Sequence, residues 1–132
     1  MAKRRLTLKL RLPAYITPRN LWRAQIHAVA TQQARLRGVS YTEEDCLQVD
    51  VRLYLDGPAI FMHDVDNRLK DILDALQGRA GGPKSTRKLK AIIPNDSQVF
   101  CVTVEKLPAP WQSHGLGHVR VTKYVPSIKD NR

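Results

Sequence analysis

The amino-terminal segment alternates strictly between apolar and polar residues. From Arg5 to Leu12 every even-numbered residue is a leucine, and every odd-numbered residue is arginine, lysine or threonine. Successive side chains of a β-strand leave opposite faces of the sheet, and a shift of one residue would turn all the leucines toward solvent. This segment therefore predicts a half-buried strand with a basic outer face.

Two helices are predicted from apolar residues at helical spacing. The first covers residues 19–37 and is ended by Gly38, and the second covers residues 66–77 and is ended by Gly78. The stripe expected to be buried on the second helix is Leu69, Ile72, Leu73 and Leu76.

Three more strands complete the predicted fold. Residues 46–55 and 118–125 alternate in polarity, whereas residues 97–106 are apolar on both faces, as expected of a central strand. The predicted fold class is α+β, in the order βαβαββ, with a mixed four-stranded sheet packed with two helices. Residues 126–132 are expected to form a frayed tail.

The length and composition favour a soluble globular protein of one domain, residues 1–132. The chain is 42% hydrophobic and 26% charged and has no run of 18 apolar residues, which argues against disorder and against a membrane span. Cys46 and Cys101 are far apart in the chain and are expected to be buried free thiols in a reducing compartment. No apolar segment of a signal peptide follows the basic amino terminus, so a cytoplasmic location is expected.

The net charge of +10 indicates a polyanionic partner. Nucleic acid is the first candidate and an anionic membrane surface the second, while a merely basic protein is the alternative. The basic outer face of the first strand and the basic residues 3–5 are expected to contact phosphates. A glycine- and proline-containing loop adds five basic residues that we predict to bind DNA, although a solvated loop would have the same composition. These five residues are Arg79, Lys84, Arg87, Lys88 and Lys90.

Four of the twelve acidic residues fall between positions 64 and 74. In an extended segment Asp64 and Asp66 would share one face, and their repulsion would be relieved by a divalent cation. Ligands that are all carboxylates favour Mg²⁺ or Mn²⁺ over zinc. In the alternative, structural interpretation, Asp66 is a helix N-cap that pairs with Lys70, and Lys70 pairs with Asp74. Asp71 and Asp74 are interpreted as solvent or structural positions.

The order of these residues resembles that of a known family. Residues 64–70 read DVDNRLK, residues 74–76 read DAL, and residues 95–99 read NDSQV. Together they resemble the RusA family of Holliday junction resolvases, which are crossover junction endodeoxyribonucleases of DNA recombination and repair. The resemblance implies a Mg²⁺-dependent, dimeric endonuclease, with Mn²⁺ as a substitute for Mg²⁺. It maps the essential residues to Asp64, Asp66 and Asp96 as metal ligands, with Lys70 as a further catalytic residue.

Two features depart from the family pattern. Asn95 stands where the family often has a first acid, and the connection from Gly78 to Asn95 is longer and more basic. The expected reaction is paired nicking of a four-way DNA junction by a metal-activated water. Two symmetric cuts require two sites related by a two-fold axis, hence a homodimer. The alternatives are a nuclease for broader branched or flap DNA, and a noncatalytic basic DNA-binding protein. The catalytic hypothesis requires that Asp96 converges with Asp64 and Asp66.

Overall fold

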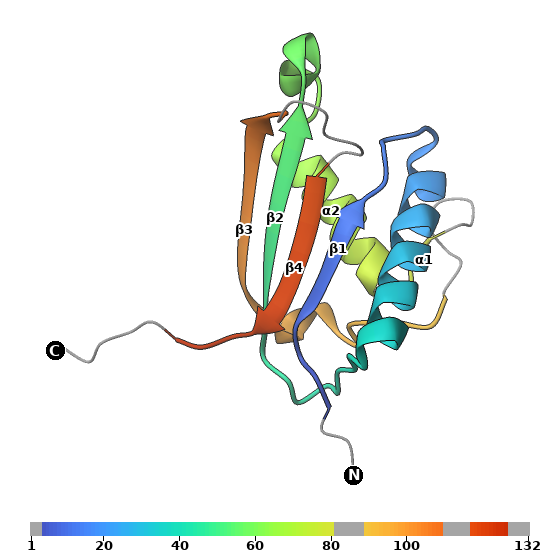
Figure 1. The fold of residues 1–132 in the computed structure, drawn as a ribbon, viewed down its shortest axis with the longest axis vertical. Helices are drawn as coiled ribbons and strands as arrows, with labels where there is room; N and C mark the ends of the chain where they lie inside the picture. The colour runs from blue at the N-terminus through green and yellow to red at the C-terminus, as the bar shows by residue number, and fades with distance from the viewer. Residues whose placement is uncertain (1–3, 81–88, 110–116, 127–132) are drawn as a thin grey trace, which may run out of the picture.

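The computed structural model of this chain describes residues 4–80, 89–109 and 117–126. Within these residues a mixed four-stranded sheet has the strand order β1-β4-β2-β3 and carries two helices (Figure 1). The elements are β1 (Leu8–Leu12), α1 (Arg19–Arg37), β2 (Leu47–Leu55), α2 (Val65–Leu76), β3 (Val99–Pro108) and β4 (Gly117–Lys123). Two short 3₁₀ helices, η1 (Gly57–Phe61) and η3 (Asp96–Gln98), precede α2 and β3. The predicted α+β class and element order are confirmed.

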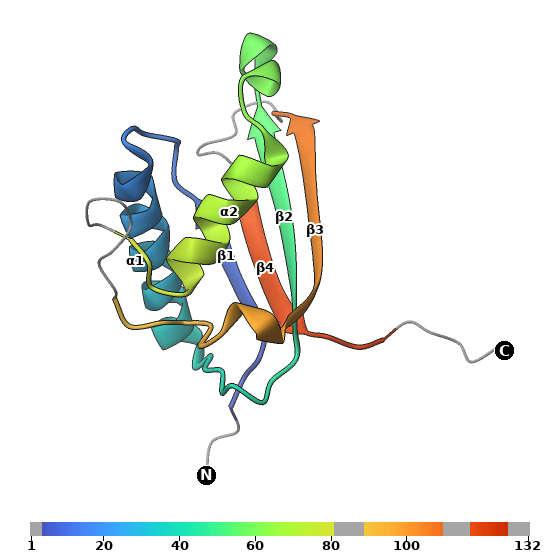
Figure 2. The ribbon, with the colours of Figure 1, turned by 180° about the vertical axis from the view of Figure 1, so that it is seen from behind.

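One face of the sheet is covered and the other is open. Side chains alternate between buried and more exposed along β1, β2 and β4, as period-two patterns require. Both helices lie on the covered side: α2 passes behind the strands in Figure 1 and in front of them in Figure 2. The core between these layers includes Leu8, Leu12, Trp22, Ile26, Leu53 and Ile72.

The third strand is an edge strand, which corrects the prediction that it is central. β3 pairs in parallel with β2, and β2 pairs on its other side with β4, so β2 and β4 occupy the centre. Phe100 is 60% exposed and Val102 is 37% exposed. Apolar residues on both faces of this strand therefore do not mean burial on both faces.

The buried stripe of α2 also differs from the predicted one. Ile72 and Leu76 are fully buried, but Leu69 and Leu73 are only partly buried. Arg68, Asp71 and Ala75 are buried instead. The difference arises because α1 approaches the side of α2 on which Asp71 binds two arginines of α1.

Backbone hydrogen bonds close the connection that leaves α2. Gly78 adopts a φ of 81°, a left-handed conformation that favours glycine. Its carbonyl accepts a hydrogen bond of 2.6 Å from the Leu89 amide, and the Leu76 carbonyl accepts from the amides of Ile92 and Ile93. The two ends of the predicted basic loop are therefore fixed to the carboxyl end of α2.

Neither cysteine is in a disulfide, as predicted, and both are partly rather than fully buried. Over the described parts of the chain, no helix combines the length and the apolar character that crossing a membrane would need.

Candidate functional site

Asp64 and Asp66 lie at the amino end of α2, as exposed carboxylates. Asp64 is the N-cap residue, with an extended backbone, which corrects the structural interpretation that gave this position to Asp66. The Asp64 side chain does not cap the helix; it accepts a hydrogen bond of 3.2 Å from the Asn67 side-chain amide. Asp66 lies in the first turn, where the helix dipole favours a negative charge. Both carboxylates therefore face solvent at one end of the helix.

Lys70 is exposed one turn after Asp66 and makes no ion pair with the described residues. The structural interpretation expected pairs between Lys70 and both Asp66 and Asp74, but no described carboxylate lies within 4.0 Å of its ammonium group. Asp74 instead approaches Arg23 of α1 at 3.6 Å. The acid pair and the lysine are therefore free to bind something else.

The turn that precedes α2 is fixed to the end of β3. The Lys106 ammonium donates hydrogen bonds to the carbonyls of Ile60 and His63, at 2.7 and 3.1 Å. The His63 ring packs edge-on against Tyr15, with 5.0 Å between ring centres. Burial, together with the charges of Arg68 and Lys106, lowers the pKa of His63. Lys106 is a positioning residue that the sequence analysis did not identify, and only its place at the end of a strand could have indicated it.

Asp96 lies in η3, immediately before β3, and its carboxylate is exposed. The neighbouring residues have structural roles: the Asn95 side chain accepts from the Ser97 amide, and the Gln98 side chain accepts from the Asn95 amide. The Gln98 side-chain amide also donates to the carbonyls of Thr42 and Asp45. The asparagine that departs from the family pattern is therefore a capping residue, and it leaves Asp96 free.

A single chain does not bring Asp96 to Asp64 and Asp66. In the parallel pair, Leu47 of β2 lies beside Val99 and Leu55 lies beside Pro108, so Asp96 precedes one end of the pair and Asp64 follows the other. β2 has nine residues and spans about 26 Å at about 3.3 Å per step. Figure 2 shows η3 and the start of α2 at opposite ends of the sheet.

Consistent with this separation, no group of three metal-binding side chains occurs within residues 4–80, 89–109 and 117–126. The donor chemistry of Asp64, Asp66 and Asp96 suits Mg²⁺, because all three offer carboxylate oxygens. The positions of these three residues within one chain do not suit a shared Mg²⁺ ion. The three-aspartate cage that the sequence predicts is therefore not formed by one molecule alone.

Asp71 has a structural role. From the sequence, this position could have been either structural or exposed to solvent. Its side chain is fully buried and forms ion pairs with Arg19 and Arg23 of α1, at 3.0 and 2.9 Å. Arg68 of α2 is 3.6 Å from the same carboxylate. The hydrogen bond to Asp71 is the largest cause of a raised pKa for Arg19. Asp71 thus joins the two helices and is not available to a ligand.

Of the five loop residues predicted to bind DNA, only Arg79 and Lys90 can be placed. Both are exposed, and each directly follows one of the two hydrogen-bonded residues, Gly78 and Leu89. Lys84, Arg87 and Lys88 lie outside the described residues.

The basic outer face of β1, also predicted, extends over the neighbouring strands. Lys9 and Arg11 of β1 share the open face of the sheet with Arg120 of β4 and Arg52 of β2. Arg52 and Arg120 were not among the residues predicted to contact phosphates. Alternation along β2 and β4 predicts a polar face for each strand. Only the strand order shows that these polar faces lie on the same side of the sheet.

Comparison with known proteins gave no match: no protein-family model fits the chain, and no curated sequence is significantly similar to it. The resemblance to the RusA family therefore rests on the motif residues.

Proposed function

We propose that this chain is a metal-dependent endonuclease that cuts four-way DNA junctions as a homodimer. The observation that carries the proposal is the group formed by Asp64, Asp66 and Lys70. Asp64 and Asp66 are exposed at the amino end of α2, Lys70 is exposed one turn after Asp66, and neither carboxylate forms an ion pair with a described basic residue. Carboxylates offer oxygen ligands to a hard cation such as Mg²⁺, and a free lysine beside them offers a point charge to a phosphate.

A second copy of the chain supplies the missing carboxylate. The outer edge of β3 has no strand partner among the described residues, and it exposes Phe100 and Val102. An open edge of this kind is suited to pairing with another strand. In an antiparallel β3–β3 pair around a two-fold axis, the first residue of one strand lies beside the last residue of the other.

This pairing would place Asp96 of one chain at the end of β3 in the other. That end is joined to the start of α2, since Lys106 of β3 holds the turn that leads to Asp64. Each of two identical sites would then contain Asp64 and Asp66 of one protomer and Asp96 of its partner. A two-fold pair of sites is also the symmetry that paired nicking of a junction requires.

A second candidate function is noncatalytic DNA binding. The distance between Asp96 and the other two acids within one chain favours it, as does the basic face of the sheet. Gel assays with a four-way junction, a duplex and a flap, each with and without Mg²⁺, separate the candidates. We expect nicking of the junction only, and only with Mg²⁺. Nicking of the flap as well would indicate the broader branched-DNA nuclease, and binding without nicking would indicate the noncatalytic protein.

Mixed dimers test whether the site is shared between chains. We expect Asp66→Asn and Asp96→Asn each to bind the junction but not to cut it. A mixed dimer of the two variants would keep one site in which all residues are wild type. Equal amounts co-refolded should therefore recover about a quarter of the wild-type nicking rate, since half of the dimers are mixed and each has one intact site.

The control for this experiment is each variant refolded alone, which should stay inactive. If each site were built within one chain, both sites of the mixed dimer would carry one substitution. An inactive mixture in which mixed dimers are detected by co-purification of a different affinity tag on each variant would therefore contradict the shared site.

A further inference from the structure

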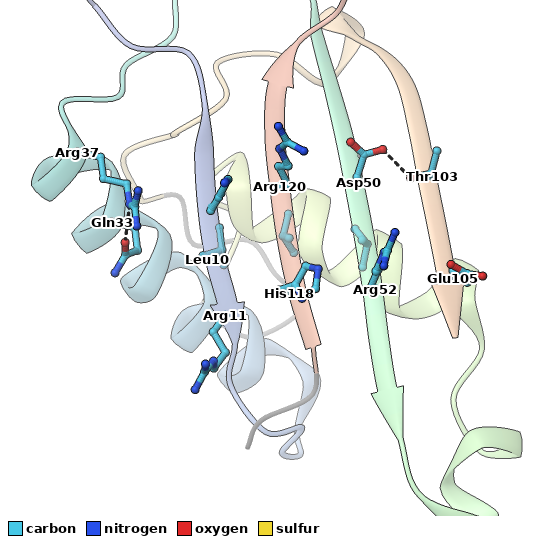
Figure 3. Close-up of a pocket in the computed structure, with 13 residues that line it drawn as sticks. Leu10, Arg11, Gln33, Arg37, Asp50, Arg52, Thr103, Glu105, His118 and Arg120 are labelled. Carbon is cyan, nitrogen blue, oxygen red and sulfur yellow. Dashed lines mark hydrogen bonds between the residues drawn. The ribbon is translucent and has the colours of Figure 1, made fainter. Parts of the chain in front are cut away.

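The open face of the sheet carries cations arranged in two rows across the strands. In one row, Arg11 of β1 lies beside His118 of β4, which lies beside Arg52 of β2. In the other row, Lys9 lies beside Arg120, which lies beside Asp50. Figure 3 shows Arg11, Arg52 and Arg120 on this face, with Arg37 of α1 at its margin.

Among the described residues, none of these cations forms an ion pair with a nearby carboxylate. Asp50 accepts hydrogen bonds from the Thr103 hydroxyl at 2.6 Å and from the Gln48 amide at 3.1 Å. No described carboxylate lies within 4.0 Å of the charged groups of Lys9, Arg11, Arg52 or Arg120. Arg37 donates a hydrogen bond to the neutral Gln33 side chain. The face therefore has a net positive charge, because its lysine and arginines outnumber Asp50 and Glu105.

His118 within the face has a lowered pKa and an aromatic neighbour. Burial lowers the pKa of His118, and the charge of Arg52 lowers it further. The His118 ring packs edge-on against Tyr54, with 5.4 Å between ring centres. The face thus combines free cations with an aromatic pair.

The face is also hollowed. The cations, together with Asp50, Thr103 and Glu105, line a shallow depression of about 740 Å³, and α1 contributes Gln33 and Arg37 to one side of it. Side chains on the same face of one strand are about 6.8 Å apart, and neighbouring strands are about 4.8 Å apart. A depression with cations at these intervals fits a curved, repeating chain of phosphates better than it fits a single small anion.

We infer that this open basic face is a second DNA-binding surface, which holds the phosphate backbone of a DNA arm. α2 and its aspartates lie on the other side of the sheet, so DNA bound to the open face is separate from DNA at Asp64 and Asp66. The inference rests on the proposed function, because a four-way junction has more than one arm to offer. A protein that holds a second arm binds a junction more tightly than a single duplex.

The test measures DNA binding without metal, so that it does not depend on cleavage. The double variant Arg11→Gln and Arg120→Gln removes two charges from the face. The matched control, Arg35→Gln and Lys123→Gln, removes two exposed charges elsewhere. Binding of a labelled four-way junction is followed by fluorescence anisotropy in EDTA, from about 50 to about 200 mM salt.

We expect the slope of log affinity against log salt to become shallower by about 1.8 in the face variant, which is about 0.9 for each phosphate that the protein no longer neutralises. The control variant should keep the wild-type slope. The variant Arg11→Lys and Arg120→Lys should also keep it, because lysine retains the charge. Thermal unfolding of each variant verifies that the fold is intact.

Equal slopes for the face and control variants would overturn the inference. The inference would also be overturned if binding to phosphatidylserine vesicles depended on the charges of this face while binding to the junction did not. A chain that never cuts in Mg²⁺ but shows the expected change of slope would remove the proposed nuclease function and leave the DNA-binding face. A chain that cuts normally with no change of slope would keep the proposed nuclease function and remove the DNA-binding face.

Discussion

At the scale of single residues, Asp71 is the most deeply buried charged group in the described part of the molecule. It is fully buried, and three guanidinium groups surround it, those of Arg19, Arg23 and Arg68. The Arg68 guanidinium stacks on the Tyr15 ring at 4.3 Å, and its Nε and Nη1 atoms have no hydrogen-bond partner among the described residues. Removing such a charged cluster from water costs free energy. The cluster stabilises the fold only while Asp71 carries its negative charge.

Replacing Asp71 should therefore destabilise the fold strongly. Asp71→Asn keeps the shape of the side chain but removes the carboxylate that pairs with buried Arg68 and the closer of the two carboxylates that pair with Arg23, and we expect a loss of about 3 kcal/mol in the free energy of unfolding. Urea unfolding at neutral pH measures it. Asp74→Asn is the matched control, because Asp74 is partly exposed and its ion pair with Arg23 is longer, at 3.6 Å; it should cost about 1 kcal/mol or less. Equal losses for the two variants would contradict this role of Asp71.

The start of a helix close to Asp66, with Lys70 one turn further on, was predicted correctly because a helical period is a local signal. That signal could not assign Asp71 to the interior. A buried carboxylate has no local signature, and the arginines of α1 that neutralise it are about 50 positions away in the chain.

At the scale of secondary structure, α1 has the predicted bounds, residues 19–37, and ends at Gly38 as expected. β3 begins later than predicted, at Val99, because residues 95–98 form a capped 3₁₀ turn. Its apolar pattern predicted a strand correctly but a central position wrongly. Strand order depends on contacts between distant segments, and for the same reason the sequence could not show that Asp96 lies at the far end of the sheet.

The turn after α2 gives a prediction at this scale. A Cβ on Gly78 would lie 2.2 Å from the Leu89 carbonyl oxygen, and its φ of 81° is unfavourable for other residues. Gly78→Ala should therefore cost about 2 to 3 kcal/mol in unfolding free energy. Gly38→Ala is the control: its φ is 67°, but no described atom lies within 4 Å of the added Cβ, so we expect only about 1 kcal/mol.

Urea unfolding of the two glycine variants, side by side, measures the difference between them. If Gly38→Ala were as damaging as Gly78→Ala, then backbone conformation alone would explain both losses. The close approach to Leu89 would then contribute nothing.

At the scale of the whole molecule, the proposed dimer depends on the free edge of β3. Phe100→Glu places a charge on that edge, which should prevent strand pairing between copies. We expect the variant to be a monomer by light scattering and to lose junction cutting while it still binds duplex DNA. Leu36→Glu, at an exposed position of α1, is the control and should remain a dimer. A dimeric Phe100→Glu that cuts junctions would rule out pairing through β3.

Ionic strength should act differently on two groups of arginines among the described residues. Arg23 and Arg68 beside Asp71 are largely buried, so dissolved ions screen them little, whereas Arg11, Arg52 and Arg120 on the open sheet face are accessible to counterions. Molar salt should therefore strip co-purifying nucleic acid from the protein without unfolding it. Preparations washed in this way would be the right starting material for measuring affinity, because leftover polynucleotide would otherwise mask the basic face.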